Sequence, residues 1–146
     1  MFSLIIDVNK NIMFCSKNYK FYYIASGDYK NNYYTPVGIT KIYEKKLTNA
    51  KFGPKFLRFD FYRLSNNFHG KSNKPYMIHG PENAKINEEG RFDKGGYLSK
   101  GCIRLSHKDL DEIYSIINVG DDVLIIPYND KQIYNNSGRM SPIKWT

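Results

Sequence analysis

The first part of the chain alternates short apolar runs with polar turns, which is typical of successive β-strands. Residues 2–8 are apolar and rich in β-branched side chains, and residues 9–11 (NKN) supply a tight turn. A second apolar run covers 12–16 and a third covers 20–25. The small and polar residues 26–28 are predicted to end the third run. The pattern therefore predicts a meander of three strands.

Further short strands are predicted as far as residue 79. Residues 35–38 (TPVG) form a turn that leads into a strand over 39–44. Residues 55–63 alternate apolar and polar side chains with a period of two, as in a half-buried strand. A short apolar run over 75–78 ends at His79 and Gly80.

The pattern changes in the last part of the chain. Residues 81–96 are polar and rich in glycine and asparagine, which predicts a loop. Ser106 is expected to cap a helix, because Asp109 three positions later completes a capping box. Apolar residues then recur at helical spacing: Leu110, Ile113, Tyr114 and Ile117. Residues 118–120 end this helix, and 122–126 return to a strand.

Length and composition fit one packed domain. The 146 residues are 41% hydrophobic and 16% aromatic, which excludes a disordered chain. Thirteen tyrosines and nine phenylalanines favour strands over helices. The residues themselves thus predict a mainly β fold with one principal α-helix.

The net charge and the hydropathy of the chain limit the classes of binding partner that are expected. The formal net charge of +8 favours polyanions such as nucleic acid, acidic lipid or a carboxylate-rich wall polymer. Only Lys45 and Lys46 form an adjacent pair among scattered lysines, and no nucleic-acid-binding motif is present, so no nucleic-acid partner is predicted. No segment is long enough for an integral membrane span. Residues 1–8 are too short for the apolar core of a signal peptide.

Cys102 is the candidate nucleophile. It lies in the run 99–105 (SKGCIRL), directly after Gly101. A glycine before a cysteine lets the backbone bend and brings backbone N–H groups close to the atom that the sulfur attacks. The thiol needs a base, and His79 is the best candidate because it ends an apolar strand and precedes a glycine. A buried structural thiol is the alternative for a cysteine considered alone.

Together these motifs resemble a known family. His79-Gly80 closes a strand, and 19 residues lie between His79 and the Ser-x-Gly-Cys-Ile-Arg-Leu run at 99–105. This pattern resembles the L,D-transpeptidase catalytic domain, the YkuD family. The similarity extends to the opening strand at 4–8, the Thr-Pro-x-Gly turn within 34–38, the helix at 109–114 and the closing strand at 119–125. It covers roughly residues 2–127.

The resemblance implies a β-sandwich-like catalytic domain over residues 1–128, with residues 129–146 as a C-terminal tail packed on the domain or trailing from it. It implies that Cys102 attacks the carbonyl of the third, L-configured residue of a peptidoglycan stem tetrapeptide and releases the terminal D-Ala. An amine from a neighbouring stem then resolves the thioester and forms a cross-link between two third-position residues. The implied partners are this donor tetrapeptide and the acceptor amine, with no cofactor and no metal.

The resemblance also assigns roles within the site. His79 would deprotonate Cys102 and protonate the leaving amine, and the Gly80 carbonyl would orient the imidazole. Backbone N–H groups of Gly101 and Cys102 would hold the oxyanion, and Ser99 would support the turn. The family also implies an extracytoplasmic location, in the cell wall or periplasm, and a thiol that carbapenems acylate.

Three further residues are predicted to contact substrate: Arg104, Lys100 and Tyr76. Arg104 matches the arginine that follows the cysteine in the family and suits a carboxylate. Lys100 is a departure, because many members have a histidine there. A lysine at this position would still favour the thiolate of Cys102 electrostatically, but His79 must then act as the base alone.

Other outcomes remain open at this point. Water in place of the acceptor amine would give an L,D-carboxypeptidase or endopeptidase, including a secreted effector that attacks the wall. A wall-binding module that has kept the fold without catalysis is the alternative from another class, although it would need neither Cys102 nor His79.

The remaining candidates are weaker. Cys15 is expected to fill the core or an edge strand, and His69 to lie in a loop. His107 is expected to be solvated in the first turn of the helix, with a smaller chance that it faces the site. A zinc site built from His69, His79, Cys102 and His107 lacks the short ligand spacings of metal sites. Trp145 and the tyrosines could stack on sugar rings, but the core and surface aromatics of a β protein are the simpler explanation.

Overall fold

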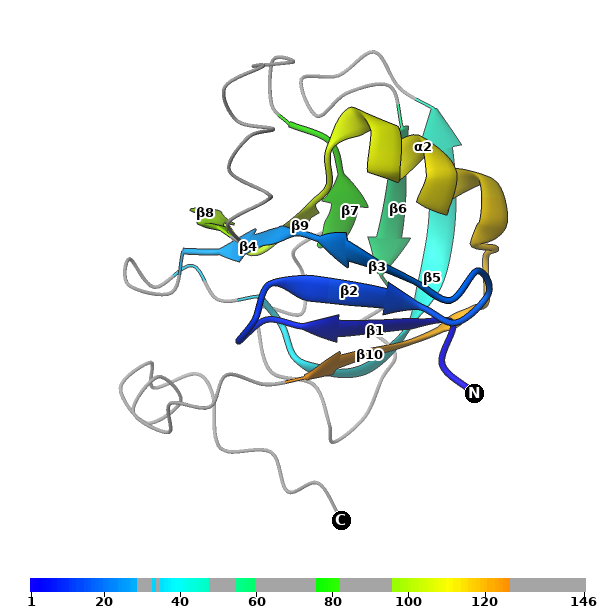
Figure 1. Ribbon diagram of the computed structural model, residues 1–146, viewed down its shortest axis with the longest axis horizontal. Helices are drawn as coiled ribbons and strands as arrows, with labels where there is room; N and C mark the ends of the chain where they lie inside the picture. Colours follow the sequence, from blue (N-terminus) through cyan, green and yellow to red (C-terminus); the bar gives the residue numbers. More distant parts are fainter. Residues whose placement is uncertain (29–32, 34, 48–54, 60–75, 82–95, 127–146) are drawn as a thin grey trace.

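The structure is a computed structural model that describes residues 1–28, 33, 35–47, 55–59, 76–81 and 96–126. The described residues form ten strands and one helix (Figure 1). In chain order these are β1 (Leu4–Asp7), β2 (Ile12–Cys15), β3 (Lys20–Tyr23), β4 (Ala25–Gly27), β5 (Gly38–Leu47), β6 (Lys55–Phe59), β7 (Met77–His79), β8 (Gly96–Ser99), β9 (Ile103–Arg104), α2 (His107–Ile116) and β10 (Asp122–Ile126). The prediction of a mainly β fold with one principal helix is confirmed.

The strands form a sheet that curls back on itself. Their order is β3-β2-β1-β10-β5-β6-β7-β9-β4-β8. The long strand β5 pairs with β10 at one end and with β6 at the other, so it belongs to both halves of the sheet. Only Ile24 separates β3 from β4, although these strands lie near opposite ends of the order. The continuous chain through β3 and β4 therefore brings the two halves together as the layers of a sandwich (Figure 1).

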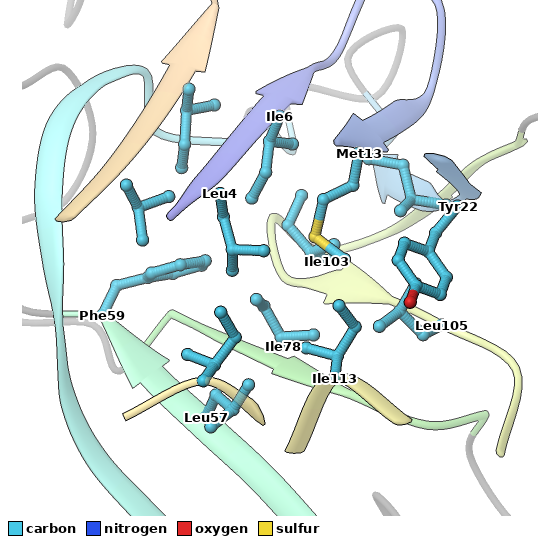
Figure 2. Close-up of a cluster of buried hydrophobic side chains, with 14 of the residues drawn as sticks. Leu4, Ile6, Met13, Tyr22, Leu57, Phe59, Ile78, Ile103, Leu105 and Ile113 are labelled. Atoms are coloured by element: carbon cyan, nitrogen blue, oxygen red, sulfur yellow. The ribbon is translucent and has the colours of Figure 1, made fainter. Parts of the chain in front are cut away.

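Inward-facing side chains of both layers and α2 form one hydrophobic core. Burial alternates along β1, where Leu4 and Ile6 are fully buried and lie beside Val123 and Ile125 of β10. Figure 2 shows residues from both halves of the sheet meeting in this core. Its labelled members are Leu4, Ile6, Met13, Tyr22, Leu57, Phe59, Ile78, Ile103, Leu105 and Ile113. Because β7 and β9 each contribute to the core, their outward faces are held on a packed support.

Helix α2 follows β9 and closes over the core. Its N-cap is Ser106, whose hydroxyl oxygen accepts a hydrogen bond from the backbone N–H of Asp109 at 3.2 Å. Leu110 and Ile113 are buried on one face of the helix, and Ile117 forms the C-cap. The predicted cap, spacing and end of the helix are confirmed. No helix in the described part of the chain is long and apolar enough to cross a membrane.

Three strand predictions need correction. Residues 26–28 were expected to end a strand, but Ser26 and Gly27 belong to β4, which lies between β8 and β9. Strand β5 runs to Leu47 rather than residue 44. Residues 96–99 form β8, where a loop was predicted to last through Gly96 and no strand was assigned before Cys102. In each case pairing with distant strands outweighs weak local preference. The predictions for 60–63, 82–95 and 129–146 lie outside the described residues.

A polar network ties β3 to α2. The Tyr22 hydroxyl donates to Glu112 Oε1 at 2.7 Å, and Lys20 Nζ lies 2.7 Å from the same oxygen. Asn18 Nδ2 donates to the Tyr22 hydroxyl at 2.7 Å. The hydrogen bonds from Lys20 and Tyr22 hold the pKa of Glu112 below its usual value, while burial and the bond to Glu112 raise that of Tyr22.

This network predicts a loss of stability in acid. A carboxylate whose folded-state pKa is depressed stabilises the fold fully above its unfolded value, 4.5 for Glu112, and this contribution disappears as pH falls through the lower folded pKa. We expect Glu112→Gln to lower the free energy of unfolding by about 1 kcal/mol at pH 7 and by less at pH 3.5. Urea denaturation at both pH values measures the difference. The control is Asp111→Asn, because that carboxylate is 61% exposed and its ion pair with Lys55 should contribute little. An equal loss at both pH values would contradict the assignment.

Candidate active site

The site is built on the neighbouring parallel strands β7 and β9. Ile78 pairs with Ile103, and His79 pairs with Arg104. The backbone N–H of Leu105 donates to the His79 carbonyl at 2.9 Å and extends this register. Since Ile78 and Ile103 point into the core, His79 and Arg104 face the other side of the sheet. Cys102 directly precedes Ile103, so the parallel register places it level with Met77, two residues before His79 on the adjacent strand, and the alternation of side chains directs it to the same face as His79.

The His79 ring is fixed by its own loop. Its Nδ1 lies 2.6 Å from the carbonyl oxygen of Gly80, and the residue is only 2% exposed. A carbonyl oxygen can only accept, so Nδ1 carries the proton in this contact. The neutral ring then has its lone pair on Nε2, which is the form that can take a proton from a thiol.

A compact turn presents Cys102. The backbone N–H of Gly101 donates to Ser99 Oγ at 3.0 Å, and the Ser99 hydroxyl donates to the Cys102 carbonyl at 2.6 Å. Gly101 has a φ of 123°, a value that side-chain-bearing residues rarely adopt. The Ser99 hydroxyl therefore fixes both ends of a turn that requires glycine at its third position.

This turn crosses the end of β4. Strand β4 pairs with β8 on one side and with β9 on the other, and the turn joins β8 to β9. The backbone N–H of Asp28, directly after β4, donates to the Ser99 carbonyl at 2.8 Å. The backbone N–H of Gly27 donates to Thr35 Oγ1 at 2.8 Å. A Cβ added at Gly27 would lie 2.0 Å from the Tyr33 carbonyl oxygen. Tyr33 and Thr35 thus pack tightly against Gly27 of β4.

Two basic residues flank Cys102. Arg104 is partly buried, and its Nε is among the buried side-chain atoms. Lys100 is exposed, with Nζ 5.8 Å from the centroid of the Tyr33 ring. Tyr33 was not identified from the sequence, and no local signal would have placed it beside Lys100. These two cations make the surroundings of the thiol suitable for an anionic ligand.

Two predicted roles do not agree with the structure. Tyr76 was expected to contact substrate, but it is 4% exposed and belongs to the hydrophobic core. It precedes β7 by one residue and lies two residues before Ile78, so the alternation of side chains directs it inward. The backbone N–H of Gly101 was expected to hold an oxyanion, but it is bonded to Ser99. Gly101 therefore serves the turn.

His107 was expected to be solvated, but the structure places it differently. It is partly buried at the start of α2, and its ring lies against Gly80. A Cβ added at Gly80 would be 2.9 Å from His107 Nδ1 and 3.0 Å from its Cε1. The ring thus packs behind the loop that orients His79. The short sequence separation of His107 from Cys102 was the only signal of this proximity.

The other candidates take no part in this arrangement. Cys15 is a fully buried thiol in the core, as expected for a packing residue, and neither Cys15 nor Cys102 takes part in a disulfide. His69 and Trp145 lie outside the described residues. Among the residues that are described, no three His, Cys, Asp or Glu side chains converge into a possible metal site.

Comparison with known proteins identifies the family of the chain. The family model of the YkuD L,D-transpeptidase catalytic domain matches residues 2–125. A search of curated protein sequences finds no match.

Among solved structures, the chain is similar to an L,D-transpeptidase from Mycobacterium smegmatis, with 16% identity, a TM-score of 0.56 and coverage of 85% of this chain and 58% of that one. It is similar to L,D-transpeptidase 3 from Mycobacterium tuberculosis with a faropenem-derived adduct, with 15% identity, a TM-score of 0.55 and coverage of 85% and 59%. It is also similar to the LD transpeptidase LdtMt1 in complex with imipenem, with 18% identity, a TM-score of 0.59 and coverage of 86% and 59%. The chain thus spans less than two thirds of the length of each of these structures, and at these identities the likeness concerns the fold.

Proposed function

The chain belongs to the YkuD family of L,D-transpeptidase catalytic domains, and from that membership we propose that it cross-links peptidoglycan stem peptides through a Cys102 thioester. The observation that carries the proposal is the parallel pairing of β7 with β9, which places Cys102 on the strand next to His79 and two residues away from it in the register. The contact between His79 Nδ1 and the Gly80 carbonyl supports the base role of His79, because it leaves Nε2 to accept the thiol proton.

Acylation is the first half of the proposed reaction. His79 Nε2 takes the proton of Cys102, and the sulfur attacks the carbonyl carbon of the third, L-configured residue of a donor tetrapeptide. The resulting tetrahedral oxyanion collapses, the carbon–nitrogen bond breaks, and the amine of D-Ala leaves with the proton held by His79. A thioester on Cys102 remains.

Transfer to an acceptor completes the cycle. The amine of a neighbouring stem attacks the thioester carbonyl and gives its proton to His79. The carbon–sulfur bond breaks, and the sulfur regains a proton from the imidazolium. Two third-position residues are then joined. Neither half of the cycle requires a cofactor or a metal, since proton transfer and thiolate attack supply the chemistry.

The surroundings of the thiol support binding of an anionic peptide. We assign the backbone N–H of Cys102 as an oxyanion donor and give Ser99 and Gly101 the task of holding the turn in shape. Arg104, beside His79 in the strand register, is assigned to a substrate carboxylate. Lys100 is assigned to the same electrostatic role at the exposed side of the turn.

Product analysis tests the proposed function. The purified chain is incubated with tetrapeptide-bearing muropeptides, and the products are separated and identified by mass spectrometry. Dimers linked through third-position residues are expected. Tripeptides alone would mean that water is the acceptor, so that the chain is an L,D-carboxypeptidase, and no change at all would overturn the enzymatic proposal. Imipenem, which is bound in one of the similar structures, provides a small probe of the same thiol.

Two broader assignments follow from the same proposal. The catalytic domain is taken to occupy residues 1–128, with 129–146 as a tail. Because the substrate lies in the cell wall, the site of action is proposed to be extracytoplasmic.

A further inference from the structure

The histidine at the start of α2 packs against the loop of the proposed base. His107 follows the N-cap Ser106, and its ring contacts the Cα side of Gly80. A Cβ at residue 80 would meet the His107 ring at 2.9–3.0 Å, closer than real Cβ contacts allow, whereas the next neighbour, Leu110 Cδ2, would be at an ordinary 3.6 Å. The His107 ring is therefore the surface that limits movement of Gly80 toward α2.

Gly80 in turn fixes the proposed base. Its carbonyl oxygen is 2.6 Å from His79 Nδ1, so a shift of the Gly80 peptide changes the direction of the imidazole. The other side of the loop is held by the hydrogen bond from the Leu105 N–H to the His79 carbonyl. The loop is thus clamped between β9 and the first turn of α2, and His107 is the side chain that supplies the α2 side of the clamp.

We propose that His107 is a positioning residue that holds the Gly80 carbonyl, and through it the His79 ring, in the orientation that activates Cys102. It acts by packing and does not touch substrate. The inference rests on the proposed roles of His79 and Cys102, but not on the identity of the acyl donor. A displacement of about 1 Å in a catalytic group can reduce a rate about a hundredfold, so a contact of this kind has a measurable consequence.

The readout is alkylation of Cys102 by iodoacetamide as a function of pH. The thiolate is the form that reacts, and a well-oriented imidazole favours the thiolate near neutral pH. Cys15 is fully buried, and peptide mass spectrometry separates its contribution. The charged groups on the elements around the site are unchanged in the His107 and Gly80 variants. They are Arg104 of β9, Lys55 and Arg58 of β6, Lys100 of the turn, Asp28 after β4, and Lys108, Asp109, Asp111 and Glu112 of α2.

The test is a double-mutant cycle across the contact. His107→Ala is expected to move the pH profile of alkylation to higher pH and to slow alkylation at pH 7 about tenfold, with the high-pH plateau unchanged. His107→Phe keeps a planar ring and should retain the original profile. Gly80→Ala should move the profile like His107→Ala, because its methyl group displaces the loop. The double variant should be no worse than His107→Ala alone, since removal of the ring makes room for the methyl group.

Each measurement can overturn the proposal. An unchanged profile in His107→Ala with a lowered melting temperature would make the residue merely structural. A His107→Phe profile displaced as far as that of His107→Ala would exclude packing as the cause, and effects of Gly80→Ala and His107→Ala that simply add would exclude the contact.

The matched control is Lys108→Ala, which changes the exposed neighbour of His107 on α2. If His107→Ala does not fold, Gly80→Ala and His107→Phe still decide the question. The alkylation assay uses no cell-wall substrate. A negative result in the muropeptide assay would therefore not change the conclusion about His107.

Discussion

Replacement of Cys102 by alanine is expected to abolish cross-link formation, with a loss of at least about 10³-fold in turnover of tetrapeptide muropeptides. The reaction requires a covalent bond to sulfur, and a methyl group cannot form one. The fold should be unaffected, because the side chain is only partly buried and the turn is braced by the Ser99 hydroxyl and the backbone. Mass spectrometry of intact protein after incubation with imipenem gives a second measurement: the native chain should gain a covalent adduct and Cys102→Ala none.

The second cysteine supplies the matched control. Cys15→Ala removes the other thiol of the chain from the core, at a cost to stability but without contact with the site. We expect the folded variant to keep its turnover and its adduct. If the adduct still forms on Cys102→Ala and is lost in Cys15→Ala, the reactive thiol is Cys15, and the assignment of Cys102 as nucleophile is wrong.

Gly27→Ala is expected to cost the fold more stability than Gly80→Ala or Gly96→Ala. The new Cβ would lie 2.0 Å from the carbonyl oxygen of Tyr33 and 2.8 Å from the backbone nitrogen of Thr35. Both are backbone atoms, so no side-chain rotation relieves the clash, and β4 must separate from the backbone of Tyr33 and Thr35. We expect a loss of about 3 kcal/mol, which corresponds to a drop of about 10 °C in melting temperature. Calorimetry or thermal circular dichroism measures it.

Gly27→Ala should also disturb the candidate active site. The N–H of Asp28 holds the Ser99 carbonyl, so a displaced end of β4 disturbs the turn that carries Cys102. Gly96→Ala on β8 is the matched control, because its added Cβ would meet only the side chain of Leu98, which can move. A melting temperature for Gly27→Ala equal to that of Gly96→Ala would show that Tyr33 and Thr35 are not packed against Gly27 as described.

Much of the architecture could be predicted because its signals are local. Strands β1, β2, β6, β7 and β10 carry apolar runs or strict alternation, and α2 has a capping serine followed by apolar residues at helical spacing. Strand β4 could not be recognised in the same way. Its sequence, Ala-Ser-Gly, has little strand preference, and it becomes a strand because β8 and β9 pair with it from both sides.

The candidate site likewise has features that local sequence predicts and features that depend on contacts between elements. The sequence by itself determined which residues are proposed to carry the chemistry, because a glycine before a cysteine and a histidine at a strand end are recognisable from residue type and order. Only the tertiary structure decided how they are supported. The register of β7 with β9, the inward direction of Tyr76, the use of the Gly101 N–H by Ser99 and the packing of His107 against Gly80 all depend on contacts between elements. Such contacts are set by packing of the whole core, and no local stretch of sequence encodes them.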